Sequence, residues 1–194
     1  MRQQAVQYRP YCQGCFAKWS ITGHLVLSTI HSNDAVTAIP RLMDLKVDKY
    51  LVSSSLLAII AQRLARKICR ICITDHILSD EEHALFKEYG IQIDKARRGT
   101  GCPKCNGSGY AGRLVIGEIL TIDDELRDLI YSDVPITAIQ SAAKRKGMIP
   151  LKEDGLRKVA QGVISLRKIG GRFCDRFRFG VDGGEDEQPP IDMR

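Results

Sequence analysis

A chain of 194 residues is long enough for one well-packed core or for two small subdomains. No apolar run approaches the ~20 residues of a membrane-spanning helix, and the N-terminus lacks the apolar stretch of a signal peptide. The seven cysteines are an odd number, which argues against a complete disulfide set. We therefore expect a cytoplasmic protein with reduced thiols. With a formal net charge of +6, basic patches could bind phosphate, nucleic acid or an acidic partner surface. Basic residues on solvated helix faces would account for this charge equally well.

The first ordered element is expected shortly after residue 20. Residues 1–20 show no clear hydrophobic period, so we treat them as an atypical N-terminal segment. Their Cys12-x-x-Cys15 pair lacks two further ligands and is interpreted as incidental. The apolar run from Leu25 to Ile30 then predicts a buried strand, parallel to its neighbours.

Two histidines bracket this strand. His24 and His31 would lie ~23 Å apart along an extended chain, too far to bind one metal ion unless the chain turns back. His31 follows the carboxyl end of the strand, which is the edge where open α/β sheets hold their ligands. Near the hydroxyl of Thr29, it could contact a phosphate or position a water. A histidine that is hydrogen-bonded within a loop accounts for the spacing equally well.

Apolar residues at helical spacing predict most of the remaining elements. The expected elements are a helix through Val36, Ile39, Leu42 and Met43 that Pro40 bends or breaks early; a helix from Lys49 to Lys67; a helix capped by Ser79; a strand from Arg113 to Leu120; and helices starting at Asp123 or Asp124, at Pro135 and at Leu151. Residues 170–194 are rich in Gly, Asp, Glu and Pro, which predicts a disordered tail.

Four cysteines in two pairs predict a metal site. These pairs are Cys69-x-x-Cys72 and Cys102-x-x-Cys105; one such pair can hold a tetrahedral Zn²⁺ ion from a single tight turn, and the second pair completes a closed site around the same ion. The gap between the pairs is longer than in most zinc ribbons. The alternative is four unrelated reduced thiols, which the pairing and the glycine-rich second turn disfavour.

The second cysteine pair carries the stronger signal. Pro103 stiffens its turn, and Gly107 and Gly109 permit positive φ, so backbone N–H groups can point at the sulfur atoms. His76 and His83 lie between the two pairs and could each replace a cysteine as ligand. We expect both histidines to be surface residues.

Taken together, these segments resemble the type II secretion and type IV pilus assembly ATPases. Five sequence segments carry the resemblance. They are the histidine box from Thr22 to Asp34, the segment Ala61-Gln62-Arg63-Leu64, the two cysteine pairs, the segment Gly109-Tyr110-Ala111-Gly112-Arg113, and the segment from Glu153 to Lys158. The resemblance runs from about Thr22 to Ile169. Its specificity comes from the order and spacing of the segments, because a single glycine-rich turn would not be specific.

The resemblance implies an α/β fold: the C-terminal part of a RecA-like P-loop ATPase domain, mostly helical, over residues 21–169, with a tetracysteine zinc subdomain at about 66–112. Such motors hydrolyse ATP with Mg²⁺ as hexamers, work with an inner-membrane platform and other secretion or pilus proteins, and are cytoplasmic or peripheral at the inner membrane. By the same resemblance, His31 and Thr29 would lie near the γ-phosphate, and His24 would support them. Arg63 would lie near the nucleotide or a subunit boundary, and the zinc would be structural.

The sequence also departs from this family. It has no G-x-x-x-x-G-K-[ST] to cradle phosphates, and no acidic strand precedes the histidine box to anchor Mg²⁺. In the family both elements would precede Thr22. Our hypothesis is a truncated or frame-disrupted copy that cannot hydrolyse ATP alone and has a marginal fold helped by zinc.

The alternative function is a zinc-dependent binding module for protein or nucleic acid. The run from Cys102 to Gly109 has the C-x-x-C-x-G-x-G form of the zinc domain of DnaJ-type chaperones. Those chaperones carry four copies of this motif and the present chain has one, which counts against the alternative. Aromatic residues make up only 6% of the chain, and none accompanies the basic clusters in a stacking pattern. We therefore do not expect a nucleic-acid partner.

Overall fold

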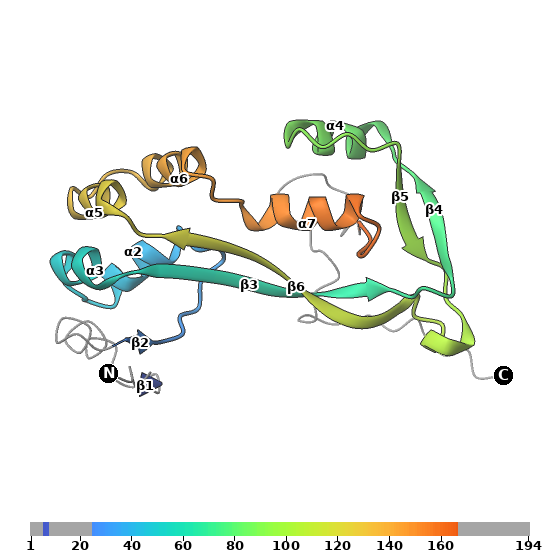
Figure 1. The fold of residues 1–194 in the computed structure, drawn as a ribbon, viewed down its shortest axis with the longest axis horizontal. Helices are drawn as coiled ribbons and strands as arrows, with labels where there is room; N and C mark the ends of the chain where they lie inside the picture. Colours follow the sequence, from blue (N-terminus) through green and yellow to red (C-terminus); the bar gives the residue numbers. More distant parts are fainter. Residues whose placement is uncertain (1–5, 8–24, 167–194) are drawn as a thin grey trace. The chain divides into compact units, whose positions relative to one another are not determined.

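The computed structural model describes residues 6–7 and 25–166 (Figure 1). The chain forms two compact units: one comprises residues up to Gln62 together with Gly117–Asp154, and the other comprises Arg63–Ile116 and residues from Gly155 onward. Strands β3 (Ala58–Ile68) and β6 (Tyr110–Thr121) pair with each other. Two of the three boundaries between the units fall inside these strands, and the third falls inside helix α7 (Leu151–Ala160), so β3, β6 and α7 each contribute residues to both units.

The first unit contains four helices and a short sheet among the described residues. Its elements, besides parts of β3 and β6 and the first residues of α7, are β1 (Val6–Gln7), β2 (Val26–Leu27), α2 (Ala38–Asp44), α3 (Lys49–Ser55), α5 (Asp124–Tyr131) and α6 (Ile136–Arg145). Its core is apolar and includes Ile39, Val52, Leu120, Leu126 and Ile130. These residues come from α2, α3, β6 and α5, so one core holds all four elements together.

The strand predicted at Leu25–Ile30 is shorter and more exposed than expected. It pairs in parallel with β1, with Val26 opposite Val6, which confirms the parallel pairing. The expectation of burial was wrong, because Leu25 is 39% exposed and Leu27 is 57% exposed. This sheet has two strands among the described residues, so β2 gains little cover from neighbours.

The predicted helix from Lys49 to Lys67 was wrong beyond its first turns. Helix α3 ends at Ser55, where Ser54 and Ser55 donate hydrogen bonds back to the carbonyls of Tyr50 and Leu51. Residues Ala58–Ile68 then form β3. Pairing with β6 favours the extended form of this segment over the helical periodicity that Ile59, Ile60 and Leu64 also satisfy.

The second unit is built from strands, two helices and one 3₁₀ turn. Besides parts of β3 and β6 it contains β4 (Ile73–Ile77), α4 (Asp80–Glu88), β5 (Lys95–Gly99), the 3₁₀ turn η1 (Pro103–Cys105) and most of α7 (Leu151–Ala160). Strands β4 and β5 lie antiparallel, side by side, in Figure 1. Phe86 of α4, Ile116 of β6 and Leu156 of α7 lie in the core of this unit.

Helix starts were predicted well because their signals are local. Ser79 and Glu82 form a capping box at α4, and the Asp123 side chain accepts the N–H of Leu126 at α5. Pro135 precedes α6, as expected. Pro40 lies in the first turn of α2, where N–H groups have no acceptor within the helix, so the helix begins near it and is not broken. No described helix is long and apolar enough to cross a membrane.

Candidate metal centre

The first cysteine pair lies in the turn between β3 and β4. Cys69 follows the last residue of β3, and Cys72 precedes the first residue of β4. The Cys69 N–H donates to the carbonyl of Gly109 at 2.9 Å, which joins this turn to the second cysteine segment. Cys69 and Cys72 are both buried.

The second pair lies on the 3₁₀ turn η1. Cys102 precedes the turn and Cys105 ends it, and Asn106 then takes a left-handed conformation. The Cys105 sulfur accepts two backbone N–H groups, from Cys102 and from Gly109, each at 3.2 Å. The predicted role of the glycines is therefore confirmed at Gly109, whose φ of +77° lets its N–H point at the sulfur.

The long gap between the pairs is closed by a hairpin. Strands β4 and β5 pair from Ile73 opposite Gly99 to Ile77 opposite Lys95, with α4 in the connection between them. Thr100 then donates to the carbonyl of Cys72 from both its N–H and its hydroxyl, at 3.0 and 3.1 Å. The chain therefore returns to the first cysteine turn, so the long gap in sequence does not separate the two cysteine pairs in space.

Glycine allows the two turns to approach closely. A Cβ placed on Gly99 would lie 1.9 Å from the carbonyl oxygen of Gly109, and one on Gly101 would lie 2.5 Å from that of Gly107. No side chain fits at such distances, which fall below the 3.0 Å that real Cβ contacts respect. The end of β5 and the second cysteine turn thus meet backbone to backbone at glycine pairs.

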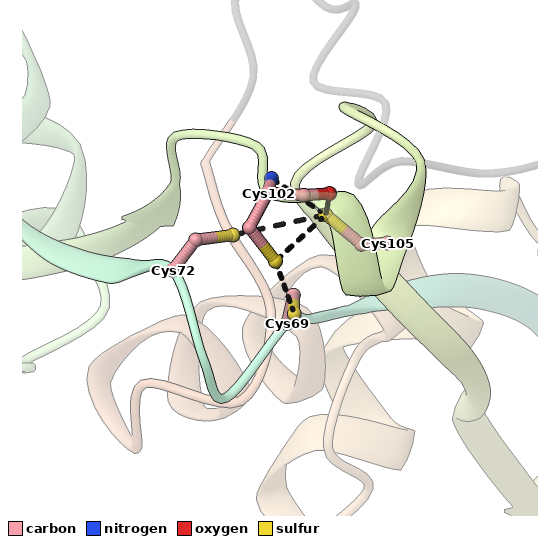
Figure 2. A group of neighbouring side chains, drawn as sticks. All are labelled: Cys69, Cys72, Cys102 and Cys105. Carbon is pink, nitrogen blue, oxygen red and sulfur yellow. Dashed lines mark hydrogen bonds between the residues drawn. The ribbon is translucent and has the colours of Figure 1, made fainter.

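The four sulfur atoms form one compact group, shown in Figure 2, and all lie within 4.8 Å of one another. The sulfurs of Cys69 and Cys102 are 3.8 Å apart, as are those of Cys72 and Cys105, and those of Cys102 and Cys105 are 3.6 Å apart. A tetrahedral zinc ion with Zn–S bonds of ~2.3 Å requires sulfur separations of about 3.8 Å. The donor set therefore fits a closed tetrathiolate zinc site.

The electrostatics of the group favour thiolates at two positions. Backbone N–H groups of Ile71 and Cys72 lower the pKa of Cys69. Burial raises the pKa of Cys105, but the N–H groups of Cys102 and Gly109 outweigh it and bring the pKa to about 6. Burial raises the pKa of Cys72 to about 11. Since a metal ion binds thiolates, a dication at the centre would offset the cost of deprotonating the buried thiol.

The residues predicted to contact nucleotide do not form one compact group in the way that the four cysteines do. Thr29 and His31 are exposed in the segment that follows β2, in the first unit, and Arg63 is exposed on β3 in the second unit. His24 lies outside the described residues, as do residues 170–194 with the predicted tail. The roles of these four residues remain predictions.

The two histidines between the cysteine pairs do not join the sulfur group. His83 is exposed on α4, as expected. His76 is 31% exposed, and its Nε2 lies 3.3 Å from the buried carboxylate of Glu82. Among the described residues, the four cysteines are the one group of His, Cys, Asp and Glu side chains that could hold a metal ion.

Sequence reasoning missed two further features, one in each unit. A hollow of about 360 Å³ is lined by Arg66, Tyr110, Gly112 and Arg113, with the Arg66 guanidinium 4.7 Å from the centre of the Tyr110 ring. In the first unit, Glu118 is buried on β6. The signal for Glu118 was present in the sequence, because it interrupts an apolar strand at a position whose neighbours two residues away, Ile116 and Leu120, both face the interior.

Two solved structures share this fold. The Legionella pneumophila ATPase DotB matches with a TM-score of 0.53 at 16% identity, over 83% of this chain and 36% of that one. The pilus retraction motor PilT with bound ADP matches with a TM-score of 0.52 at 21% identity, over 84% and 37% respectively. The described part of this chain therefore has the fold of part of each of these two proteins, and it contains the four-cysteine group.

Sequence comparison identifies the family. The model of type II/IV secretion system proteins matches residues 16–171, and the chain belongs to this family. The type II secretion system ATPase E of Vibrio cholerae is 43% identical over 77% of this chain and 30% of its own length. The type IV pilus assembly ATPase PilB of Thermus thermophilus is 40% identical over 80% of this chain and 18% of its own length. The chain thus spans less than a third of these relatives.

Proposed function

We propose that this chain carries the C-terminal part of an ATPase motor that powers type II secretion or type IV pilus assembly. The observation that carries the proposal is the match over residues 16–171 to a family whose relatives are named as secretion and pilus assembly ATPases. In such a motor the chain would belong to a homo-oligomer, a hexamer, that meets an inner-membrane platform and other secretion or pilus proteins from the cytoplasm.

The metal centre is proposed to hold a structural Zn²⁺ ion. The sulfur separations of 3.6 to 3.8 Å and the two N–H donors to Cys105 support this choice. Four thiolates leave no coordination position for water, so the ion would join two turns and take no part in hydrolysis. Binding would stabilise the second unit, because the unfolded chain does not preform the site.

The nucleotide site is proposed to be incomplete in this chain. His31, supported by Thr29 and His24, would face the terminal phosphate of ATP, and Arg63 would lie near the nucleotide or a subunit boundary. Exposure of Thr29, His31 and Arg63 is compatible with these roles. The sequence contains no G-x-x-x-x-G-K-[ST] loop to hold the β- and γ-phosphates with Mg²⁺, so we propose that the chain does not hydrolyse ATP by itself.

An ATPase assay with a matched variant tests this proposal. Purified protein is incubated with ATP and Mg²⁺, alone and beside His31→Ala. We expect both proteins to release phosphate at the background rate. Turnover well above that of His31→Ala would refute the proposed inertness and would assign His31 to catalysis. Co-purification with secretion or pilus assembly proteins tests the motor assignment separately.

One observation favours a second function, a zinc-dependent binding module. The hollow beside Tyr110 carries two guanidinium groups, from Arg66 on β3, which leads to the first cysteine turn, and from Arg113 on β6, which leads away from the second. Such a surface suits acidic side chains of a protein partner or phosphates of a nucleic acid. A salt-dependent mobility shift with DNA or RNA would support the nucleic-acid form of this alternative, which we do not expect.

A further inference from the structure

Glu118 places a carboxyl group where its strand otherwise presents apolar side chains to the interior. It is 4% exposed, and its neighbours on the same face of β6, Ile116 and Leu120, are each 1% exposed. A buried carboxylate is costly unless hydrogen bonds replace its lost hydration. The donors that satisfy Glu118 therefore show what the residue holds in place.

Both oxygens of Glu118 accept backbone N–H groups from distant parts of the first unit. One oxygen accepts the N–H of Ala35, 83 positions away, and the other accepts the N–H of Leu151 at 2.7 Å, 33 positions away. Ala35 is completely buried, so water cannot replace the carboxylate as its acceptor. One side chain thus joins two segments through their main chains.

The first of these segments is the turn that directly follows His31. The Ser32 hydroxyl donates to the carbonyl of Asp34 at 2.8 Å, and the N–H of Thr37 donates to the Asp34 carboxylate at 2.7 Å. The hydroxyls of Ser32 and Thr37 lie 2.8 Å apart. The turn is therefore closed by its own side chains, and Glu118 fixes it from outside through Ala35.

The second segment is the first turn of α7. Leu151 is the first residue of this helix, and its N–H is one of those that have no acceptor within the helix. In return, the carboxylate of Asp154 accepts the N–H of Gly117 on β6 at 2.9 Å. Two carboxylates thus tie β6 to the start of α7, and that of Glu118 also reaches the turn after His31.

We propose that Glu118 is a positioning residue that couples the turn after His31 to the first turn of α7. Loosening either segment frees one oxygen of the carboxylate, lets the side chain shift, and weakens its hold on the other segment. The coupling holds in place the turn that follows His31, which would help His31 to make the phosphate contact suggested above. Only this link to His31 rests on the proposed function. The coupling itself requires no nucleotide.

Amide hydrogen exchange measured by NMR at Ala35 and Leu151 tests the coupling. Glu118→Gln retains one acceptor oxygen and replaces the other by an amide group, so at least one of the two N–H groups should exchange about tenfold faster or more. The matched control is Asp154→Asn, which alters the neighbouring tie between β6 and α7. We expect it to leave exchange at Ala35 unchanged.

A double-mutant cycle separates coupling from a purely structural role. Thr37→Ala loosens the turn from within, and it should accelerate exchange at Leu151 in the wild-type background but add nothing in the Glu118→Gln background. The proposal is overturned if Thr37→Ala accelerates Ala35 but leaves Leu151 unchanged, or if Glu118→Gln leaves both amides at wild-type rates. If Glu118→Gln does not fold, the exchange rate of the Leu151 amide in Thr37→Ala alone decides whether the two segments are coupled.

Addition of ATP and Mg²⁺ in a separate arm distinguishes this inference from the proposed function. A response of the His31 ring signals would support the suggested phosphate contact, and no response would agree with the incomplete nucleotide site proposed for this chain. The exchange coupling between Ala35 and Leu151 is then still decided by the nucleotide-free measurements.

Discussion

Replacing Gly99 by alanine tests whether the glycine pairs build the metal centre. An added Cβ would lie 1.9 Å from the carbonyl oxygen of Gly109, so the two backbones must separate by about 1 Å to restore a 3.0 Å contact. That movement draws Gly109 away from two hydrogen bonds, one from the N–H of Cys69 and one to the sulfur of Cys105. The pair of lost bonds and the overpacking predict a destabilisation of about 3 kcal/mol.

The assay is urea unfolding followed by far-ultraviolet circular dichroism, with zinc content measured on the same samples. Gly99→Ala should unfold at lower urea and retain less zinc than the wild type. The matched control is Gly90→Ala, which has a positive φ of +66° but no atom within 4 Å of the added Cβ. It should cost ~1 kcal/mol from backbone strain and keep its zinc. A Gly99→Ala protein with wild-type stability and full zinc content would refute the argument.

Two further predictions concern metal and pH. If zinc occupies the four-cysteine group as proposed, chelation should lower the melting temperature, because the ion would bind the folded chain whereas the unfolded chain has no preformed site; an unchanged melting temperature would remove zinc from the stability argument. Contacts with Lys146 lower the pKa of Asp123 and of Glu125, and these carboxylates raise the pKa of Lys146. The stability from this cluster is therefore complete between about pH 5 and 10, is lost in acid as the carboxylates protonate, and is lost in strong base as Lys146 deprotonates. Lys146→Met should lower the melting temperature at pH 7 and make little difference at pH 2, and equal differences at both pH values would contradict this assignment.

Local signals in the sequence predicted much of this structure. The cap at Ser79, the start of α5 at Asp123 and the grouping of the two cysteine pairs depend on residues a few positions apart or on the chemistry of a side chain. Such signals act wherever the segment lies in the fold. They can therefore be read without knowledge of any distant partner.

The failures involve partners that are remote in sequence. Residues Ala58–Ile68 satisfy a helical period as well as an extended one, and the pairing with β6, about fifty positions later, decides the outcome. The strand β5 is basic and short, so its pairing with β4 gave no apolar signal. The role of Glu118 depends on two backbone N–H groups, and backbone donors leave no trace in a residue pattern.

The hairpin that leaves Cys72 and returns at Thr100 has a practical consequence. Its two ends are fastened to each other 28 positions apart, so its distal part can change length without altering the spacing of the sulfurs. Gly90, next to the end of α4, has open space around it. A fluorophore or short epitope inserted there would label the protein while the group of four sulfur atoms kept its shape.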